Sequence, residues 1–167
     1  MSLTAGGFNT ASGWFSLKQL TTGNLNTAVG AGTLVLSTSD QRNTAIGAGA
    51  LLRNAGGGQN TAAGSLALLF NTVGSFNTAV GDEALTANID GMDNAATGVG
   101  ALVANTTGDG NTAGGRGALA RNTGGNNNTA LGYQAGFNAT TGDGNVYLGA
   151  DMQGVADEAN PHLHPEY

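Results

Sequence analysis

The chain has 167 residues, and more than half of them are Gly, Ala, Thr or Asn. Charged residues make up only 10% of the sequence, the formal net charge is −6, and there is no cysteine. Scarce Lys and Arg exclude nucleic acid as an expected partner, and the lack of Cys excludes disulfides and thiolate metal sites. No apolar run approaches the length of a transmembrane helix, so we expect no direct membrane insertion of this sequence.

In chain order, a lead-in over residues 1–8 precedes a repeat over residues 9–160, and a tail covers residues 161–167. The repeat has a period of 17 residues without insertion or deletion. Gly at repeat position 5 recurs in all nine copies, as does Asn at position 1. These asparagines are Asn9, Asn26, Asn43, Asn60, Asn77, Asn94, Asn111, Asn128 and Asn145. Recurrence at one short period predicts a single elongated solenoid domain of nine coils.

Each copy contains the same predicted elements. Thr-Ala-Val/Ile/Leu at positions 2–4 predicts a short strand, and the Gly at position 5 turns the corner after it. Positions 8–11, residues 50–53 for example, predict a second strand, and Asn-Thr-x-Gly at residues 105–108 predicts a closing turn. Stacked coils place Asn over Asn and Thr over Thr, so amide ladders are expected. The residues assigned to this framework are Asn26, Thr27, Gly30, Asn43, Thr44, Gly47, Leu51, Asn60, Gly64, Asn77 and Gly81.

The predicted core is thin. Each coil offers one Leu at position 9 and one or two further aliphatic residues, and the second strand is apolar on both faces. One apolar face of this strand fills the coil. The other is left without a partner in the single chain, so we expect an obligate oligomer. The alternative is that position 10 only decorates a loop, because singly exposed apolar residues are common. The threonines of position 2 are predicted to face inward.

The motifs Asn26-Thr27-Ala28-Val29-Gly30 and Asn43-Thr44-Ala45-Ile46-Gly47 make the repeat similar to a known family. They resemble the Asn-Ser-Val-Ala-Ile-Gly repeats of YadA-like heads in trimeric autotransporter adhesins. The phrase over residues 101–113 is also similar to repeats in tail-fibre-like bacterial proteins. The resemblance implies an all-β, left-handed parallel β-roll assembled as a homotrimer, on a bacterial cell surface or outside the cell. It also implies an outer-membrane anchor in a part of the protein outside this sequence.

Few residues offer chemistry. His162 and His164 could share a metal as an i, i+2 pair, but a terminal tail is the preferred interpretation, so no metal and no cofactor are expected. Asp109 and Asp143 lie in Gly-Asp-Gly sequences and are interpreted as ordinary turn residues. No nucleophile has a base beside it, so we expect no enzyme.

The expected function is a non-enzymatic adhesin head or fibre module that binds host or environmental surfaces, protein or glycan, through a repetitive lateral face. Residues that vary between copies are assigned to that face: Arg53, Asp82, Glu83, Arg116 and Arg121. Bulky rings near the two ends are assigned as caps of the stack: Trp14, Phe15, Tyr133, Phe137 and Tyr147. One alternative is a structural spacer rod of a phage-tail-like or surface fibre. Another is an ice-binding protein that uses the regular threonine column.

Overall fold

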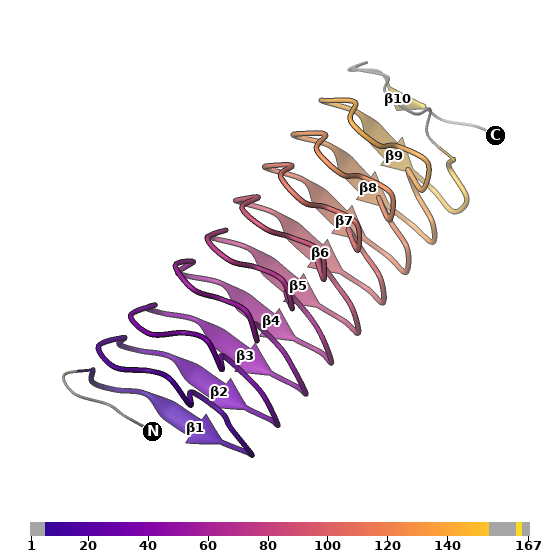
Figure 1. Ribbon diagram of the computed structural model, residues 1–167. Helices are drawn as coiled ribbons and strands as arrows, with labels where there is room; N and C mark the ends of the chain where they lie inside the picture. The colour runs from indigo at the N-terminus through magenta and orange to yellow at the C-terminus, as the bar shows by residue number, and fades with distance from the viewer. Residues whose placement is uncertain (1–5, 154–162, 165–167) are drawn as a thin grey trace.

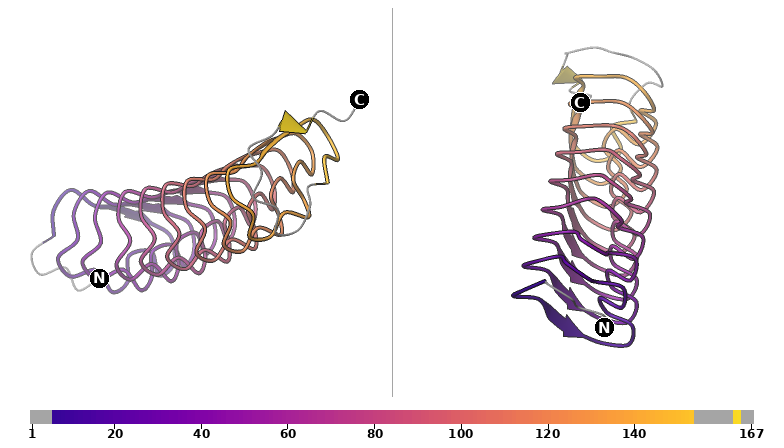
Figure 2. Two further views of the ribbon diagram at one scale, coloured as in Figure 1. Left: turned by 90° about the horizontal axis from the view of Figure 1, so that it is seen from above. Right: turned by 60° about the vertical axis from the view of Figure 1, so that its left-hand side comes forward.

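The computed structural model describes residues 6–153 and 163–164. Its coils stack along one axis into an elongated rod, with β1 and β9 toward opposite ends (Figures 1 and 2). Each coil gives one short strand to a single parallel sheet, and strands adjacent in sequence are adjacent in the sheet. No helix occurs in the described residues, so the predicted all-β solenoid is confirmed. The strands are β1 (Thr10–Ser12), β2 (Thr27–Val29), β3 (Thr44–Ile46), β4 (Thr61–Ala63), β5 (Thr78–Val80), β6 (Ala95–Thr97), β7 (Thr112–Gly114), β8 (Thr129–Leu131), β9 (Val146–Leu148) and β10 (Leu163–His164).

The strand register follows the sequence period. Thr27 pairs with Thr44 and Ala28 with Ala45, and the same 17-residue offset holds from β1 to β9. The offset continues into β10, where Leu163 pairs with Val146. Backbone pairing therefore reaches two residues of the segment predicted as a tail. His162 lies outside the described residues.

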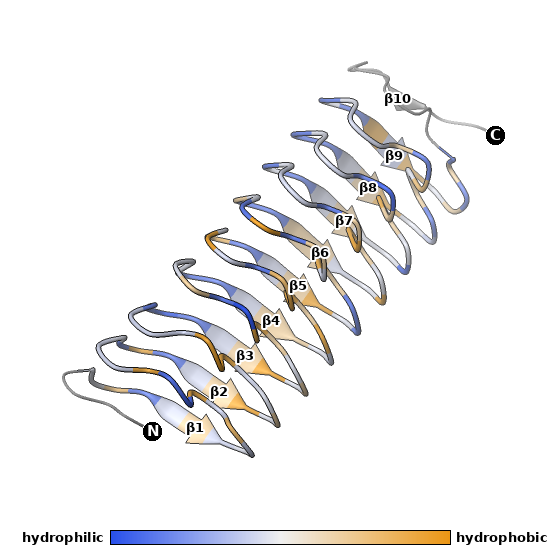
Figure 3. Ribbon diagram, in the orientation of Figure 1, coloured by the Kyte–Doolittle hydropathy of each residue, from blue (hydrophilic) through white to orange (hydrophobic). Residues whose placement is uncertain are grey.

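The interior is built from columns of identical side chains. Alanines of position 3 are buried from Ala28 onward, as are the leucines of position 9, and Ala45 and Leu51 are both fully inaccessible. Small side chains at position 8, such as Ala50, are buried beside them. Apolar colour gathers at the tips of β2, β3 and β5, while the connecting chain alternates between near-neutral, hydrophilic and apolar stretches (Figure 3). An alanine column facing a leucine column gives a narrow, closely packed interior.

The prediction of a second strand at positions 8–11 is wrong, because the chain makes turns there. Leu51 has a φ of 50° and Gly49 a φ of 70°, so residues in the left-handed region alternate along this segment. Ala50 and Leu51 are adjacent yet both fully buried, which the alternation of an extended strand would prevent. A left-handed leucine costs about 1–2 kcal/mol. Burying its side chain contributes about 1.5–3 kcal/mol, and its N–H also donates to Ala67 of the next coil.

The asparagines of position 1 form the predicted ladder. The backbone N–H of Asn60 donates to Oδ1 of Asn43 at 2.9 Å, and that of Asn77 donates to Oδ1 of Asn60 at 2.9 Å. From Asn26 to Asn128, each Nδ2 also donates to a carbonyl across its own coil, as Asn60 does to Gly74 at 2.9 Å. These side chains are almost fully buried. Each of these asparagines therefore bonds to the coil before it and to the coil after it, and it makes a third hydrogen bond within its own coil.

A second buried ladder runs along position 12. Nδ2 of Asn88 donates to Oδ1 of Asn71 at 2.8 Å and to the carbonyl of Gly91 at 2.9 Å. The same pair of bonds recurs at the other members, among them Asn105, for which the sequence alone predicts only a turn. The ladder consists of Asn54, Asn71, Asn88, Asn105 and Asn122.

A buried carboxyl group begins this second ladder. The coil before Asn54 has Ser37 at position 12, and it has Asp40 where most coils have the Gly of position 15. Nδ2 of Asn54 donates to Oδ2 of Asp40 at 2.7 Å, in place of the missing asparagine oxygen. Burial raises the pKa of Asp40, and the hydrogen bond from Asn54 opposes that rise. Asp40 thus caps the ladder at an electrostatic cost.

Two glycine positions let the coils approach closely. Gly47, at position 5, has a φ of 122°, and a Cβ there would meet the carbonyl of Gly64 in the next coil. Gly57, at position 15, leaves no room for a Cβ between Asn54 and Asn71 of the ladder. The predicted corner role of position 5 is consistent with this geometry, because only glycine adopts that φ freely.

Candidate binding surfaces

The outer side of the parallel sheet carries two columns of exposed side chains, at positions 2 and 4. We call this surface the sheet face. Thr61, Thr78 and Thr112 are exposed at position 2, and aliphatic side chains follow at position 4. The exposed aliphatic residues there include Val29, Ile46, Val80, Leu131 and Leu148. The prediction that the threonines face inward is wrong, because the narrow interior accepts only the alanine between them.

The hydroxyls of the sheet face are not used inside the protein. Within the described residues, no threonine of position 2 donates a side-chain hydrogen bond to another protein group. Threonines of position 13 behave differently: the Thr72 hydroxyl donates to Ile89 O at 3.0 Å and the Thr106 hydroxyl to Thr123 O at 2.8 Å. Position 2 therefore presents a regular row of unengaged hydroxyls at the spacing of parallel strands, about 4.8 Å.

No charged residue occurs on the sheet face. Positions 2–4 of all nine copies contain only Thr, Ser, Ala, Gly, Val, Ile, Leu or Tyr, although the chain carries a net charge of −6. The charged residues lie at other positions of the sequence. Long apolar or uncharged surfaces of this kind mark interfaces more often than free protein surface.

The residues assigned to a lateral face are all exposed: Arg53, Asp82, Glu83, Arg116 and Arg121. They do not form one cluster. Arg53 and Arg121 share position 11, four coils apart, and the others lie at positions 6 and 7. Each of those two arginines lies over an aromatic ring, Arg53 at 4.9 Å from the Phe70 ring centre and Arg121 at 5.1 Å from that of Phe137.

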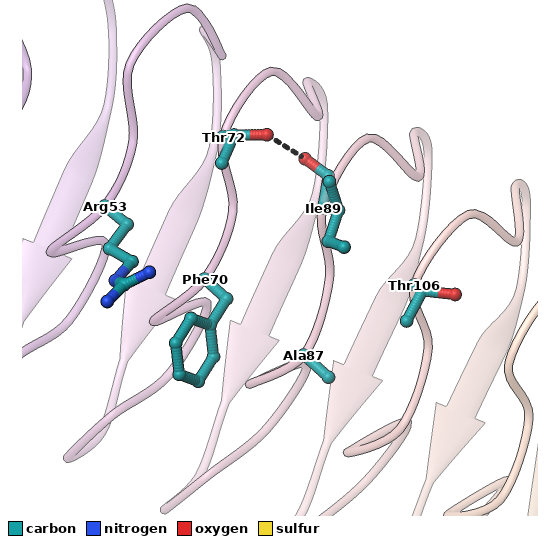
Figure 4. Close-up of a pocket in the computed structure, with 6 residues that line it drawn as sticks. All are labelled: Arg53, Phe70, Thr72, Ala87, Ile89 and Thr106. Carbon is teal, nitrogen blue, oxygen red and sulfur yellow. Dashed lines mark hydrogen bonds between the residues drawn. The ribbon is translucent and has the colours of Figure 1, made fainter.

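A groove was missed by the sequence interpretation. It has a volume of about 350 Å³ and is lined by Arg53, Phe70, Thr72, Ala87, Ile89 and Thr106 (Figure 4). These residues belong to positions 11 and 13, the two columns that flank the buried asparagines of position 12. Comparing position 11 between successive copies could have found it, because large residues there give way to Ala87 and Ala104.

The aromatic residues predicted to cap the two ends differ in how far they are buried. Trp14 and Phe15 stack on each other with ring centres 4.1 Å apart, and 73% of the Trp14 surface is exposed. Leu17 and Leu20 are the buried large side chains of the first coil. Toward the C-terminal end of the rod, Tyr133 is 43% exposed, whereas Tyr147 is buried. Tyr147 therefore fills the interior near the C-terminal end. Trp14 and Phe15 belong to the first coil and stack on each other with much of their surface in solvent.

The turn aspartates have structural partners. Oδ1 of Asp109 accepts the N–H of Met92 at 2.7 Å, and Oδ1 of Asp143 accepts the N–H of Asn126. Both bonds join a coil to the coil before it. Within the described residues there is no group of three or more His, Cys, Asp or Glu side chains that could hold a metal ion. The same residues include no helix with the length and apolar character needed to cross a membrane.

No family model, curated protein or solved structure matches the chain.

Proposed function

We propose that the chain is a non-enzymatic fibre or adhesin-head module that assembles as a homotrimer and binds surfaces through its lateral faces. The observation that carries the proposal is the sheet face, which is uncharged and runs along β1 to β9. A second and third copy are its best occupants, because an uncharged face that runs along the rod can line a threefold axis in every copy, and closed cyclic assemblies of one chain are common. The number three and the left-handed coil follow from the resemblance to YadA-like heads.

The exposed aliphatic residues supply a driving force for this assembly. Val29, Ile46, Val80, Leu131 and Leu148 are 38–48% exposed in the single chain. Complete burial of each such side chain is worth about 1.5–3 kcal/mol, so their remaining exposure represents several kcal/mol per chain. The threonines beside them offer hydroxyls that can pair between copies.

The other faces are then free for binding. Arg53, Asp82, Glu83, Arg116 and Arg121 all lie outside positions 2–4, so assembly through the sheet face leaves them accessible. A trimer presents every lateral feature three times, and weak contacts to a cell or matrix surface add through avidity. This arrangement suits an extracellular or cell-surface location. A structural spacer is the same rod without the lateral ligand.

Mass photometry of the chain at nanomolar and micromolar concentration tests the assembly. We expect a trimer, and we expect the double variant Val29→Asp with Ile46→Asp to dissociate it by burying charge in the interface. Arg116→Asp is the matched control, because it changes charge on a lateral face and should leave the trimer intact. A folded, stable monomer at micromolar concentration would reject the proposal. A binding screen of the trimer against matrix proteins, glycans and cells then separates adhesin from spacer.

The outward threonines favour a second candidate, ice binding. A flat array of hydroxyl and methyl groups at regular spacing is a surface that could order water, and the position 2 column supplies it over most of the rod. Ala95 and Val146 interrupt the column. Ice binding uses the sheet face of a free chain, whereas assembly covers it. A monomer with thermal hysteresis that is lost in Thr44→Lys with Thr78→Lys would select ice binding.

A further inference from the structure

The groove interrupts an otherwise repetitive surface. Along position 11 the side chains are large at Arg53 and Phe70, shrink to Ala87 and Ala104, and become large again at Arg121. Three coil steps separate Phe70 from Arg121, or about 14 Å at the strand spacing. The hollow therefore arises from a local change in side-chain size over a regular backbone.

The walls of the groove are mostly apolar. Phe70 is 38% exposed and Ile89, in a column that is otherwise mostly threonine, is 46% exposed. The hydroxyls of Thr72 and Thr106 already donate to backbone carbonyls of the following coils. An apolar ligand that lies against these walls therefore leaves few hydrogen-bond donors of the groove without a partner.

One cation lies at the end of this apolar hollow. The guanidinium of Arg53 lies 4.9 Å from the centre of the Phe70 ring, beside the groove (Figure 4). Within the described part of the chain, no carboxylate comes close enough to form an ion pair with it. Its fork of donors can therefore engage an external carboxylate through two parallel bonds.

We infer that the groove binds an amphiphilic carboxylate, a molecule or chain end with one carboxylate on an apolar body. The carboxylate pairs with Arg53, and the apolar body lies against Phe70, Ala87 and Ile89. A volume of about 350 Å³ is at the small end of ligand pockets, which suits a body of roughly ten carbon atoms. The assignment deepens the proposed lateral binding, and it rests on that proposal only in requiring the groove to stay open after assembly.

Calorimetric titration of the full chain with decanoate tests the inference, with decanol and decylamine as probes of equal length. We expect decanoate to bind more tightly than either. Arg53→Gln should weaken decanoate about tenfold and leave decanol unchanged, because it removes one charged hydrogen-bonding pair. Arg42→Gln is the matched control, because Arg42 is an exposed arginine outside both the groove and the assigned lateral face, and it should leave decanoate binding unchanged.

A second variant tests the cavity without touching the charge. Ala87→Leu fills the groove and should weaken every probe that binds there, and Leu36 at the same repeat position indicates that the coil accepts leucine. Circular dichroism melting of each variant checks the fold. Equal binding of decanoate and decanol would overturn the inference. So would equal effects of Arg53→Gln and Arg42→Gln, or no effect of Ala87→Leu.

The two proposals fail separately. A trimer that does not bind decanoate rejects only the groove assignment. A monomer that binds decanoate with the expected Arg53 dependence rejects only the assembly.

Discussion

The middle coils and the end coils solve the same packing problem with different residues. From Asn54 to Asn122, position 12 carries a buried polar ladder in which each amide bonds to its neighbours. At the ends, Leu20 and Ala139 occupy that position and are buried. A ladder member needs a coil on both sides, because a buried amide without a partner costs about 1–3 kcal/mol. Polar columns therefore suit the middle of the rod, and apolar residues suit its ends.

The two boundaries of the ladder show this cost directly. Asp40 supplies an acceptor for Asn54 at the beginning. At the other boundary Ala139 supplies none, and among the described residues the buried Oδ1 of Asn122 has no hydrogen-bond partner. One boundary is thus capped by a residue with a raised pKa, and the other leaves an acceptor unsatisfied.

The largest expected effect tests the close approach of the middle coils. Gly64→Ala should destabilise the fold by at least about 3 kcal/mol, because a Cβ at a φ of 149° would meet the backbone of Gly81. Chemical denaturation measures the change. Gly144→Ala is the control near the end of the rod: its φ is 70° and a Cβ would meet open space, so a loss of about 1 kcal/mol is expected. Equal losses would contradict the view that coil contact, and not φ alone, requires glycine.

The next effect tests a size exchange at the C-terminal end. Position 9 is Gly136 in the eighth coil, and the ring of Tyr147 fills the space, since a Cβ on Gly136 would lie 2.6 Å from Cδ2 of Tyr147. Tyr147→Ala should cost about 3–5 kcal/mol, and Gly136→Leu should also destabilise. The double variant restores the Leu and Ala that the middle coils have at these positions. Its loss of stability should be smaller than the sum of the two single losses by about 2 kcal/mol. Additive losses would show that the two residues do not share one cavity.

A smaller effect separates the middle of the ladder from its end. Asn88→Ala should cost about 2–3 kcal/mol, because it leaves buried partners in Asn71 and Asn105 unsatisfied. Ala139→Asn should instead stabilise by about 0.5–1.5 kcal/mol by donating to Oδ1 of Asn122. Thermal and urea unfolding of both variants give the measurement. A loss on Ala139→Asn would show that the end coil cannot accept the larger side chain.

The smallest effect concerns pH. Burial raises the pKa of Asp40 above its ordinary value of 3.8, so the folded chain holds its proton more tightly than the unfolded chain. The free energy of unfolding therefore falls as pH rises from the pKa of Asp40 in the unfolded chain to its pKa in the folded chain. Asp40→Asn keeps an acceptor for Asn54 without the charge, so it should be more stable than the wild type at pH 7. The difference should shrink toward pH 4 in urea titrations, and a constant difference would assign the effect to packing.

Much of the architecture was predictable because it depends on period and residue size. Nine asparagines at a constant interval require in-register coils, so the parallel sheet, the ladder of position 1 and the glycine corners follow from the sequence. The exposure of Arg53 and Arg116 was also predictable, because residues that vary between copies contribute least to the framework.

Only the tertiary structure decided which way the side chains point. Local propensity makes positions 8–11 a strand, yet Leu51 adopts a left-handed φ, because burial and a hydrogen bond to Ala67 offset its strain. That turn brings Ala50 and Leu51 together into the interior, leaves room only for the small Ala45 opposite, and sends the neighbouring threonines outward. The groove has the same origin, since the change from Phe70 to Ala87 becomes a hollow only when separate coils stack. These features depend on contacts between residues about 17 apart, and the free energy of such contacts is not contained in any local segment.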